Sequence, residues 1–508
     1  MPKLVRRNGH YALFVNGAPY LMLGAQVNNS SAWPAMLPEV WPVMEELHAN
    51  TVEMPIYWEQ FESVQGRFDD SVLKALLRGA RAHQVHLVLL WFGTWKNGSG
   101  HYTPRFIKLN ETQAPHVVNA QGKKVDSLSP YSTFAMHADA RAFADLMGDL
   151  KRLDPQHTVI MVQVENETGA YGTDRDYSPA AQKLFDGPVP EKLLAAMHKA
   201  PGTWAQVFGA DANEYFQAWS IARYVNFVAA AGKAVNPLPL YVNAALPDPF
   251  HALYPGGYDS GGPMPMNIRI WKAAAPSIDL LAPDIYMPDY RRYTKELDLY
   301  DRPDNAMFVP ETGNKGLYAR YFFAALGHGA IGFSPFGMDA TGYVNYPLGA
   351  RKIDAKTVAP FGLNYRIFEP MDRVIAKLNF EGKVQAVSED PAVHTQTLHF
   401  GKWDVVVEYG MPQFGNGMKP KGNQPPDGGA MVAQLGPNEF LVTAVHARVD
   451  FKVADAASGL QRQFVEVQQG QYAGSQWHFK RIWNGDQTDY GLNFTSGVQV
   501  LKVTLATY

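Results

Sequence analysis

Cysteine is absent from this chain of 508 residues, and charged residues make up only 18% of it. Without cysteine the chain has no disulfides, thiolate nucleophiles or cysteine-ligated metals. The formal net charge of −3 offers no basic surface of the kind that binds nucleic acid or an anionic membrane. No HExxH or phosphate-loop pattern occurs. Metal and nucleotide chemistry therefore have no support in the sequence, and we expect no cofactor.

Long apolar runs are also missing. No run approaches the roughly 18 residues of a membrane span, and the basic N-terminus is not followed by the apolar region of a signal peptide. We therefore expect a soluble protein without a membrane span. Its compartment stays open: periplasmic or secreted if a signal peptide was removed, and otherwise cytoplasmic. Whether it forms a homo-oligomer is open as well.

Aromatic residues, by contrast, are abundant, with 11 Trp, 25 Tyr and 27 Phe. Sugar-binding clefts use such rings as stacking faces, although a single aromatic residue more often belongs to a hydrophobic core. The composition is thus compatible with a neutral sugar as partner, without assigning any one ring to a site.

Short apolar runs alternate with amphipathic segments up to about residue 340. The runs predict eight strands, at residues 20–26, 51–58, 85–93, 158–167, 238–246, 278–287, 306–313 and 330–337. Apolar positions spaced by three and four residues predict helices within 37–49, 71–84, 140–153, 213–235 and 317–329. Near-continuous apolar strands that alternate with helices indicate a parallel sheet, and eight repeats indicate its closure into a (β/α)₈ TIM barrel.

The pattern changes after about residue 380, where short alternating runs are separated by Gly, Asn and Asp turns. The runs lie at 383–390, 395–410, 438–453, 461–472, 475–486 and 498–508. They predict an antiparallel β-sandwich. We therefore divide the chain into a barrel at residues 1–375, which opens with a short hairpin turning at Asn16-Gly17, and a β-sandwich domain at 376–508.

Two glutamates mark the ends of predicted barrel strands. In such barrels the active site lies at the C-terminal ends of the strands. Glu167 ends the fourth strand and Glu311 the seventh, so we expect both to face the same bowl. Glycoside hydrolysis needs two carboxyl groups that flank one bond. Glu165 and Glu53 are mid-strand and are predicted to be buried supporting residues, with Glu165 one layer below Glu167 by the strand period.

Other acids near strand ends are rivals for this role, namely Asp284, Glu59 and Asp339. Any one of them alone also fits a helix cap or a structural ion pair. Long loops rich in Pro, Gly, Asn and Tyr follow the third, fourth and fifth strands, and long loops in a compact domain are more often functional lids than accidents.

The run "IMVQVENE", Ile160 to Glu167, resembles the fourth-strand signature of glycoside hydrolase family 35, the β-galactosidases, among the retaining β-glycosidases of clan A. The family usually continues with Tyr-Gly where this chain has Thr168-Gly169. The clan pattern is Asn-Glu at the end of strand four and Glu at the end of strand seven. Asn166, Glu167 and Glu311 match it.

The resemblance implies a role for each of these residues. Glu167 is the general acid/base, Glu311 the nucleophile, and Asn166 the residue that bonds the sugar 2-hydroxyl. Tyr286 looks like the clan's tyrosine that donates a hydrogen bond to the nucleophile. The mechanism then requires Glu311 to stay ionised and Glu167 to hold a proton near neutrality.

The segment "LLWFGTWKNG" and the C-terminal "RIWNGDQTDYGLNF" look most like a bacterial branch of family 35 that acts on galactosides, in part in xyloglucan breakdown. On that resemblance the sugar subsite is lined by Trp91, Trp95 and Asn97. Neighbours that fit a core equally well are Tyr57, Trp58 and Trp33. Asn28, which ends the first strand, either bonds a hydroxyl or makes a turn.

Two departures from the family leave the sugar open. The tyrosine that many members carry in the second strand is replaced near Pro55, and the third strand lacks the "CAEW"-like sequence that helps recognise galactose. The sequence therefore predicts a retaining exo-β-glycosidase, in the first place a β-galactosidase acting on a galactoside oligosaccharide or polysaccharide fragment. The alternatives are a β-glucosidase or α-L-arabinosidase of the same clan, and a non-catalytic carbohydrate-binding barrel.

Overall fold

The computed structural model of the chain describes residues 1–251, 254, 256–415, 417–495 and 497–508. Its contacts divide the chain into two compact units. The first comprises Met1–Lys3, Gln26–Trp41 and Thr51–Ile285. The second comprises Leu4–Ala25, Pro42–Asn50 and Tyr286–Tyr508.

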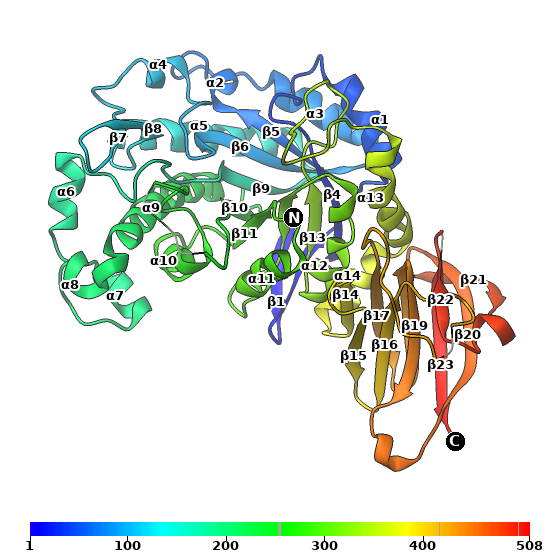
Figure 1. Ribbon diagram of the computed structural model, residues 1–508. Coiled ribbons are helices and arrows are strands. Elements are labelled where there is room, and N and C mark those ends of the chain that lie inside the picture. Colours follow the sequence, from blue (N-terminus) through cyan, green and yellow to red (C-terminus); the bar gives the residue numbers. More distant parts are fainter. Residues whose placement is uncertain (252–253, 255, 416, 496) are drawn as a thin grey trace. The chain divides into compact units, whose positions relative to one another are not determined.

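Eight strands form a closed barrel in the order β10-β11-β12-β13-β4-β5-β6-β9, as the sequence predicts (Figure 1). Their bounds are β4 Met22–Gln26, β5 Thr51–Tyr57, β6 His86–Lys96, β9 Val159–Asn166, β10 Leu240–Ala245, β11 Leu280–Ile285, β12 Val309–Thr312 and β13 Gly332–Pro335. Every residue of β5 and β9 is buried, which accounts for their near-continuous apolar sequences.

Strands β6 and β9 pair in parallel with a shift of register. Trp91 lies opposite Val164, but the next paired residues are Lys96 and Asn166. Residues 92–95 of β6 therefore lie opposite Glu165 alone. Such a bulge bends the strand locally and turns side chains in new directions, and bulges are common beside active sites.

The predicted helices are present between the strands. They are α1 Leu37–Leu47, α3 Ser71–Ala82, α5 Thr133–Leu153, α9 Ala212–Val235 and α12 Tyr321–Gly327. Helix α5 begins upstream of the predicted segment because the Ser132 hydroxyl caps it, accepting a hydrogen bond from the amide of Ala135 at 3.0 Å. Helices α5 and α9 pack closely, and a Cβ at Gly232 would lie 2.3 Å from the Phe143 ring.

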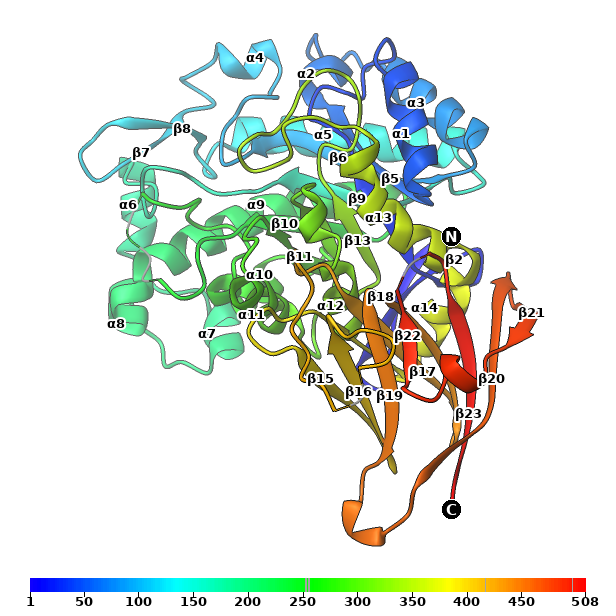
Figure 2. The same cartoon turned by 45° about the vertical axis from the view of Figure 1, so that its right-hand side comes forward.

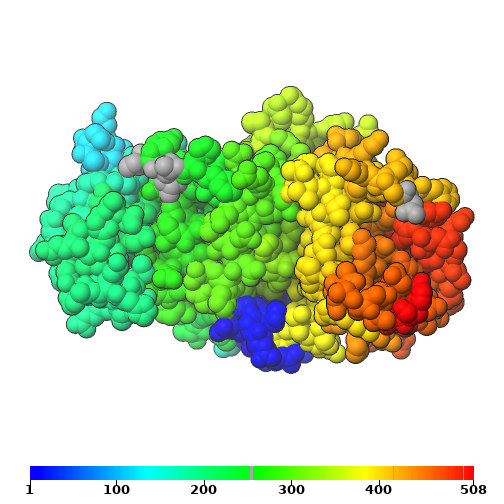
Figure 3. Space-filling view, turned by 60° about the horizontal axis from the view of Figure 1, so that its bottom comes forward, coloured from blue at the N-terminus to red at the C-terminus, as the bar shows by residue number. Residues whose placement is uncertain are grey.

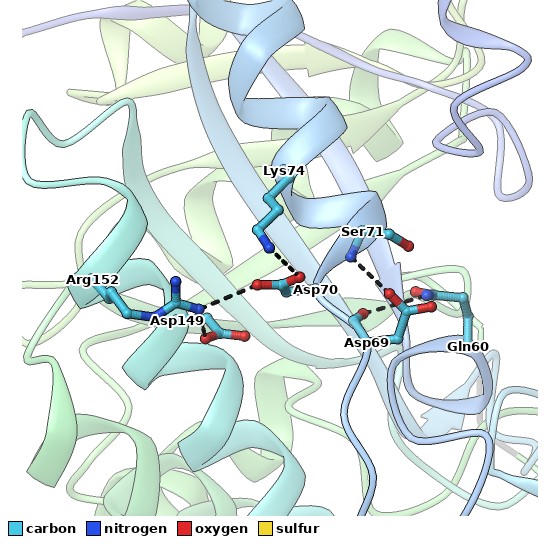
Figure 4. A network of polar contacts seen from close by, with 7 residues as sticks. All are labelled: Gln60, Asp69, Asp70, Ser71, Lys74, Asp149 and Arg152. Atoms are coloured by element: carbon cyan, nitrogen blue, oxygen red, sulfur yellow. Dashed lines mark hydrogen bonds and ion pairs between the residues drawn. The ribbon is translucent and has the colours of Figure 1, made fainter.

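A surface network joins the start of α3 to α5 (Figure 4). Asp69 accepts a hydrogen bond from the amide of Ser71 at 2.9 Å. The side chain of Ser71, and after it this amide, lower the pKa of the Asp69 carboxyl. Asp70 pairs with Lys74 at 2.8 Å and with Arg152 of α5 at 3.2 Å. Because these side chains are largely exposed, the network orients the helix ends more than it stabilises the fold.

Further short elements lie in the connections. Those of the first unit are α2 Trp58–Phe61, α4 Arg105–Lys108, β7 His116–Val118, β8 Lys124–Leu128, α6 Pro179–Phe185, α7 Glu191–Met197, α8 Trp204–Phe208, η1 Gly209–Asp211, η2 Pro265–Asn267 and α10 Ile268–Ala274. Those of the second are α11 Tyr290–Tyr300, η3 Gly316–Tyr318, α13 Ala355–Phe368, η4 Glu369–Met371, α14 Asp372–Phe380, η5 Ala456–Ser458 and η6 Gly485–Gln487. The predicted lid after the fifth strand lies partly outside the described residues, at 252, 253 and 255.

The C-terminal strands form two antiparallel sheets that share one core, as predicted (Figure 2). The sheet β14-β17-β18-β23-β20-β21 uses Val384–Ser388, Gly429–Gly436, Glu439–Val445, Val500–Thr507, Arg462–Ala473 and Gln476–Ile482 in that order. The sheet β15-β16-β19-β22 uses Thr395–Phe400, Trp403–Tyr409, Ala447–Val453 and Leu492–Phe494. Of these strands β17 and β22 were not predicted.

The predicted N-terminal hairpin is β2 (His10–Val15) and β3 (Ala18–Tyr20), which with β1 (Lys3–Arg7) form a small sheet. Asn16 and Gly17 both have positive φ, as a two-residue hairpin turn requires. The hairpin packs on α14, where the rings of Phe14 and Phe380 lie 5.6 Å apart (blue against yellow in Figure 3). Among the described residues no helix is both long and apolar enough to cross a membrane.

Tyr365 of α13 supports the pairing of β13 with β4. Its buried hydroxyl lies 2.8 Å from the carbonyl oxygens of both Gly24 and Phe333. We predict that Tyr365→Phe lowers the free energy of unfolding by about 1–2 kcal/mol, because buried carbonyls lose a donor. Urea unfolding measures this. Tyr171→Phe, at a side chain 60% exposed, is the control and should change stability little; equal losses in both variants would contradict the prediction.

Candidate active site

Glu167 follows β9 in a strained backbone conformation. Its φ is +44°, and that of Glu165 is +64°, a region that non-glycine residues seldom occupy. The amide of Glu167 donates to Oδ1 of Asn243 at 2.9 Å, and Nδ2 of Asn243 donates to Asp284 at 2.6 Å. Strands β10 and β11 thus hold the backbone of Glu167 in place. Backbone strain of this kind clusters at functional sites.

Two ionisable groups lie near the buried Glu167 side chain, and a third, Asp259, lies near one of them. Lys96, carried by the β6 bulge, places Nζ 4.0 Å from Glu167 Oε2 and is itself buried. A carboxylate oxygen of Asp284 lies within 4.8 Å of one of Glu167. Burial raises the pKa of Asp259 to about 6, while the charge of Lys96 opposes that rise. The Lys96 ammonium thus lies among acidic side chains in a region largely shielded from water.

Glycines allow Asp259 to approach these strand ends. A Cβ at Gly98 would lie 2.4 Å from its carboxylate, and one at Gly169 would lie 2.7 Å from its backbone oxygen. Both glycines also have positive φ. Any larger residue at either position would push the loop of Asp259 away from the ends of β6 and β9.

Asn166, the last residue of β9, is fully buried, and neither its Nδ2 nor its Oδ1 has a hydrogen-bond partner in the described structure. Buried amides are nearly always bonded, so an unpaired one calls for an explanation. A ligand hydroxyl, which can both donate and accept, would satisfy this side chain.

Glu311 is the penultimate residue of β12, in the second unit, and is 4% exposed. The hydroxyl of Tyr286 donates to Glu311 Oε1 at 2.5 Å, the hydrogen bond that the family resemblance implies. The hydroxyl of Tyr318 in turn donates to the backbone oxygen of Tyr286 at 2.5 Å. These two bonds fix the Tyr286 side chain against the Glu311 carboxylate.

Glu165 is buried, as predicted, but does not lie one layer below Glu167 within the barrel. Its positive φ breaks the two-residue period of the strand, and its carboxyl meets Asp139 on α5. It accepts a hydrogen bond from the amide of Trp95 at 2.7 Å. Glu53 follows the prediction more closely: it is fully buried and accepts a hydrogen bond from the hydroxyl of Tyr241 at 3.0 Å.

Trp91 and Trp95 were predicted to line the sugar subsite, and the structure places both in the core instead. Both rings are fully buried. Trp91 Nε1 donates to Asp139 at 2.8 Å, and Trp95 Nε1 donates to Ser127 at 3.1 Å. Rings enclosed on all sides and already bonded cannot stack on a sugar. Both indole N–H groups find acceptors within the core, Asp139 for Trp91 and Ser127 for Trp95, which holds the two rings there.

Trp33 and Tyr57 belong to an aromatic stack. The rings of Trp33 and Tyr57 lie 5.4 Å apart at 20°, and those of Tyr57 and Tyr102 lie 5.6 Å apart at 17°. The amide of Ala32 donates to the Tyr57 hydroxyl at 3.2 Å, which fixes the loop of Trp33. Tyr57 is buried, whereas Trp33 is 42% exposed and offers its ring to solvent. Trp58 lies in the core against Trp91.

The remaining candidates divide into two groups. Asn97 is exposed, has a positive φ and accepts a hydrogen bond from Lys96. Asn28 is buried, and its backbone oxygen accepts a hydrogen bond from the amide of Ser31 at 2.9 Å. Of the rival acids, Glu59 forms an exposed pair with Lys108 at 2.7 Å, and Asp339 bonds the hydroxyl of Thr341 at 2.6 Å.

The sequence reading did not identify Lys96, Asn243 or Asp259 as site residues. Lys96 stands beside the predicted Asn97, but only the bulge brings it to Glu167. Asn243 had a usable signal, because "NAAL" is a polar end to an apolar strand. Asp259 lies far along a loop, and no sequence pattern marked it as a site residue.

The loop after β10 is held against α9 by Glu214, a residue of that helix. This buried carboxyl accepts hydrogen bonds from Tyr258 Oη at 2.8 Å, the Gly261 amide at 2.8 Å and Asn267 Nδ2 at 2.6 Å. Ser260 and Ala170 exchange backbone hydrogen bonds, which links the same loop to the end of β9. Burial raises the pKa of Glu214 to about 7, against the pull of these three donors.

Comparisons with known proteins bear on the two parts of the chain separately. The model of a domain of unknown function, DUF5597, matches residues 361–495, from within α13 to the end of the sandwich strand β22. No curated protein matches the sequence.

Among solved structures, the chain is similar to three β-galactosidases. The one from Bacillus circulans sp. alkalophilus is 14% identical, with a TM-score of 0.51 over 71% of this chain and 57% of that one. The one from the psychrophilic Marinomonas ef1 is 13% identical, with a TM-score of 0.50 over 70% and 61%. The one from Rahnella sp. R3 is 15% identical, with a TM-score of 0.50 over 74% and 59%.

The chain thus spans about three fifths of the length of these relatives. At such identities the likeness establishes the fold, a closed (β/α)₈ barrel followed by an antiparallel β-sandwich.

Glu214 makes the stability of the protein depend on pH. Its folded pKa of about 7 lies above its ordinary value of 4.5, so the native state keeps a proton that the unfolded state releases. The free energy of unfolding should therefore fall as pH rises from about 4.5 to about 7, by about 3 kcal/mol at most. Glu214→Gln should flatten this part of the curve in urea unfolding. A variant with the same slope as the wild type would contradict the assignment.

Proposed function

We propose that the chain is a retaining exo-β-glycosidase, a β-galactosidase that removes terminal galactose from oligosaccharides such as xyloglucan fragments. The observation that carries the proposal is that two strands of one closed parallel barrel each end in a buried glutamate with its own supporting residues. Glu167 is accompanied by Asn166 and Lys96, and Glu311 by Tyr286. The likeness to three β-galactosidases agrees with this choice of sugar.

The proposed reaction has two displacements. In the first, a carboxylate oxygen of Glu311 bonds to the anomeric carbon while the glycosidic carbon–oxygen bond breaks. The leaving oxygen keeps the electron pair and takes the proton of Glu167. In the second, a water molecule gives a proton to the Glu167 carboxylate, its oxygen bonds to the anomeric carbon, and the carboxylate of Glu311 departs.

The surrounding groups support these roles. Tyr286 donates a hydrogen bond to the attacking carboxylate and holds it in position before the first step. The unpaired amide of Asn166 matches the sugar 2-hydroxyl, whose hydrogen bonds strengthen in the transition state. Lys96 stabilises the ionised Glu167 that acts as base in the second step.

Hydrolysis of p-nitrophenyl β-galactoside, beside the β-glucoside and the α-L-arabinoside, tests the proposal. Glu167→Ala should lower kcat by at least about a hundredfold and Glu311→Ala by more, because each removes a group that bonds to a reacting atom. Azide should restore turnover of an activated aryl galactoside by Glu167→Ala, since it needs no base to attack the glycosyl-enzyme. Glu59→Ala, at an exposed acid, is the matched control.

The results separate the candidate functions. A preference for the glucoside or the arabinoside would replace galactose with that sugar. A wild type that turns over none of the three glycosides would leave a carbohydrate-binding barrel as the better account.

Trp33 is proposed to stack on a second sugar ring of an oligosaccharide. One face of the indole rests on Tyr57, and the ring is exposed at the end of the barrel where β4 and β5 terminate. Trp33→Ala should raise KM for a galactosylated xyloglucan oligosaccharide by about tenfold, the loss of one stacked ring, and leave the nitrophenyl galactoside unchanged. For Trp33→Phe we expect a KM between those of the wild type and Trp33→Ala. Equal effects on both substrates would refute the assignment.

A further inference from the structure

Two carboxyl groups, Glu165 of β9 and Asp139 of α5, meet in a fully buried place behind the candidate active site. Asp139 accepts three hydrogen bonds. Trp91 Nε1 donates to Oδ1 at 2.8 Å, while the amide and the hydroxyl of Thr94 donate to Oδ2 at 3.2 and 2.6 Å. Glu165 Oε2 accepts from the amide of Trp95 at 2.7 Å. All these donors belong to β6.

One of the four carboxyl oxygens of the pair accepts no hydrogen bond from the described residues. Glu165 Oε1 has no donor in the described structure, and the group beside it is the carboxyl of Asp139. No Lys, Arg or His in the described chain bonds to either residue. Two ionised carboxylates can only accept hydrogen bonds and repel each other, whereas a proton on one of them turns it into a donor. Because both Asp139 oxygens are already occupied by donors, the proton belongs on Glu165.

We propose that Glu165 and Asp139 share one proton and that this neutral-plus-ionised pair is a positioning device, which fixes the β6 bulge and through it Lys96 beside Glu167. The pair binds Trp91, Thr94 and Trp95, and Lys96 is the next residue of the strand. Glu165 itself stands two residues before Glu167. The pair therefore holds both strands that meet at the carboxylate assigned as acid/base, and this part of the inference rests on the proposed function.

The surroundings agree with a retained proton. Burial raises the pKa of both carboxyls, and the nearby charge of Asp139 raises that of Glu165 further. The other titratable group that faces the pair is Tyr224 of α9, whose hydroxyl lies 2.8 Å from Thr94 Oγ1 and whose pKa burial also raises. Tyr224 is thus neutral wherever the pair holds its proton. When the pH rises and the proton leaves, two negative charges remain in a buried site and repel each other. The pair then no longer fixes the β6 bulge.

Glutamine and asparagine substitutions test the pair, because they mimic the neutral form at only one of the two positions. Glu165→Gln can donate to Asp139 and accept from Trp95, with no proton to lose. Asp139→Asn has one acceptor oxygen for donors that need two. We expect Glu165→Gln to keep kcat/KM for the nitrophenyl galactoside within about threefold near neutrality and to move the alkaline loss of activity upward by at least about one pH unit. Asp139→Asn should lose at least about tenfold.

A second measurement does not depend on activity. The slope of unfolding free energy against pH counts protons that the native state keeps. At pH values above the ordinary Glu pKa of 4.5 it should be smaller by one proton in Glu165→Gln than in the wild type, until the wild-type pair releases its proton. An unchanged slope would overturn the shared proton even in an active enzyme. The positioning role would be overturned if Glu165→Gln lost activity at the same alkaline pH as the wild type. It would also be overturned if Glu165→Gln and Asp139→Asn lost kcat/KM equally. A wild type that hydrolyses no glycoside but shows the slope change would keep the pair and overturn the proposed function instead.

Discussion

The register shift between β6 and β9 is the constraint on which the candidate site depends most. A parallel pair in regular register would carry Trp91, Trp95 and Glu167 in directions set by the strand period. The extra residues of β6 opposite Glu165 bring Lys96 to the end of β9 instead. Glu165, the residue of β9 at this shift, has a positive φ, so the backbone of β9 changes direction just before the proposed acid/base. Scaffold and site therefore share one irregularity.

Much of the fold was predictable because its physical causes are local. Buried parallel strands have to be apolar throughout, so eight apolar runs separated by amphipathic helices indicated the barrel. The placement of Glu167 and Glu311 near the ends of buried strands was predictable for the same reason, because each stands where an apolar run stops, whereas their catalytic roles stay a prediction. Strand β17 was missed because it follows a long Pro/Gly loop, and β22 because three residues carry too little pattern.

The rest depends on tertiary geometry. The assignment of Trp91 and Trp95 to a sugar subsite came from the family resemblance, and the structure buries both rings because their indole nitrogens find acceptors in the core. The prediction that Glu165 lies one layer below Glu167 was wrong because it assumed a regular two-residue period, which the positive φ of Glu165 interrupts. Asp259 and Glu214 became recognisable only when distant segments met, Asp259 against Gly98 and Gly169, and Glu214 against Tyr258, Gly261 and Asn267. Such contacts reflect the fold as a whole and leave no motif in the chain.

The aromatic stack at Trp33 has a spectroscopic consequence. In the part of the chain that the structure describes, Trp33 is the one tryptophan among the strongly exposed hydrophobic residues, whereas Trp58, Trp91, Trp95, Trp204, Trp271 and Trp403 are fully enclosed. The enclosed indoles emit from surroundings that a ligand cannot reach. Quenching by an external solute would then come from Trp33 and from the partly exposed Trp477 of β21, and a change of emission on adding a sugar that binds beside Tyr57 would come mainly from Trp33.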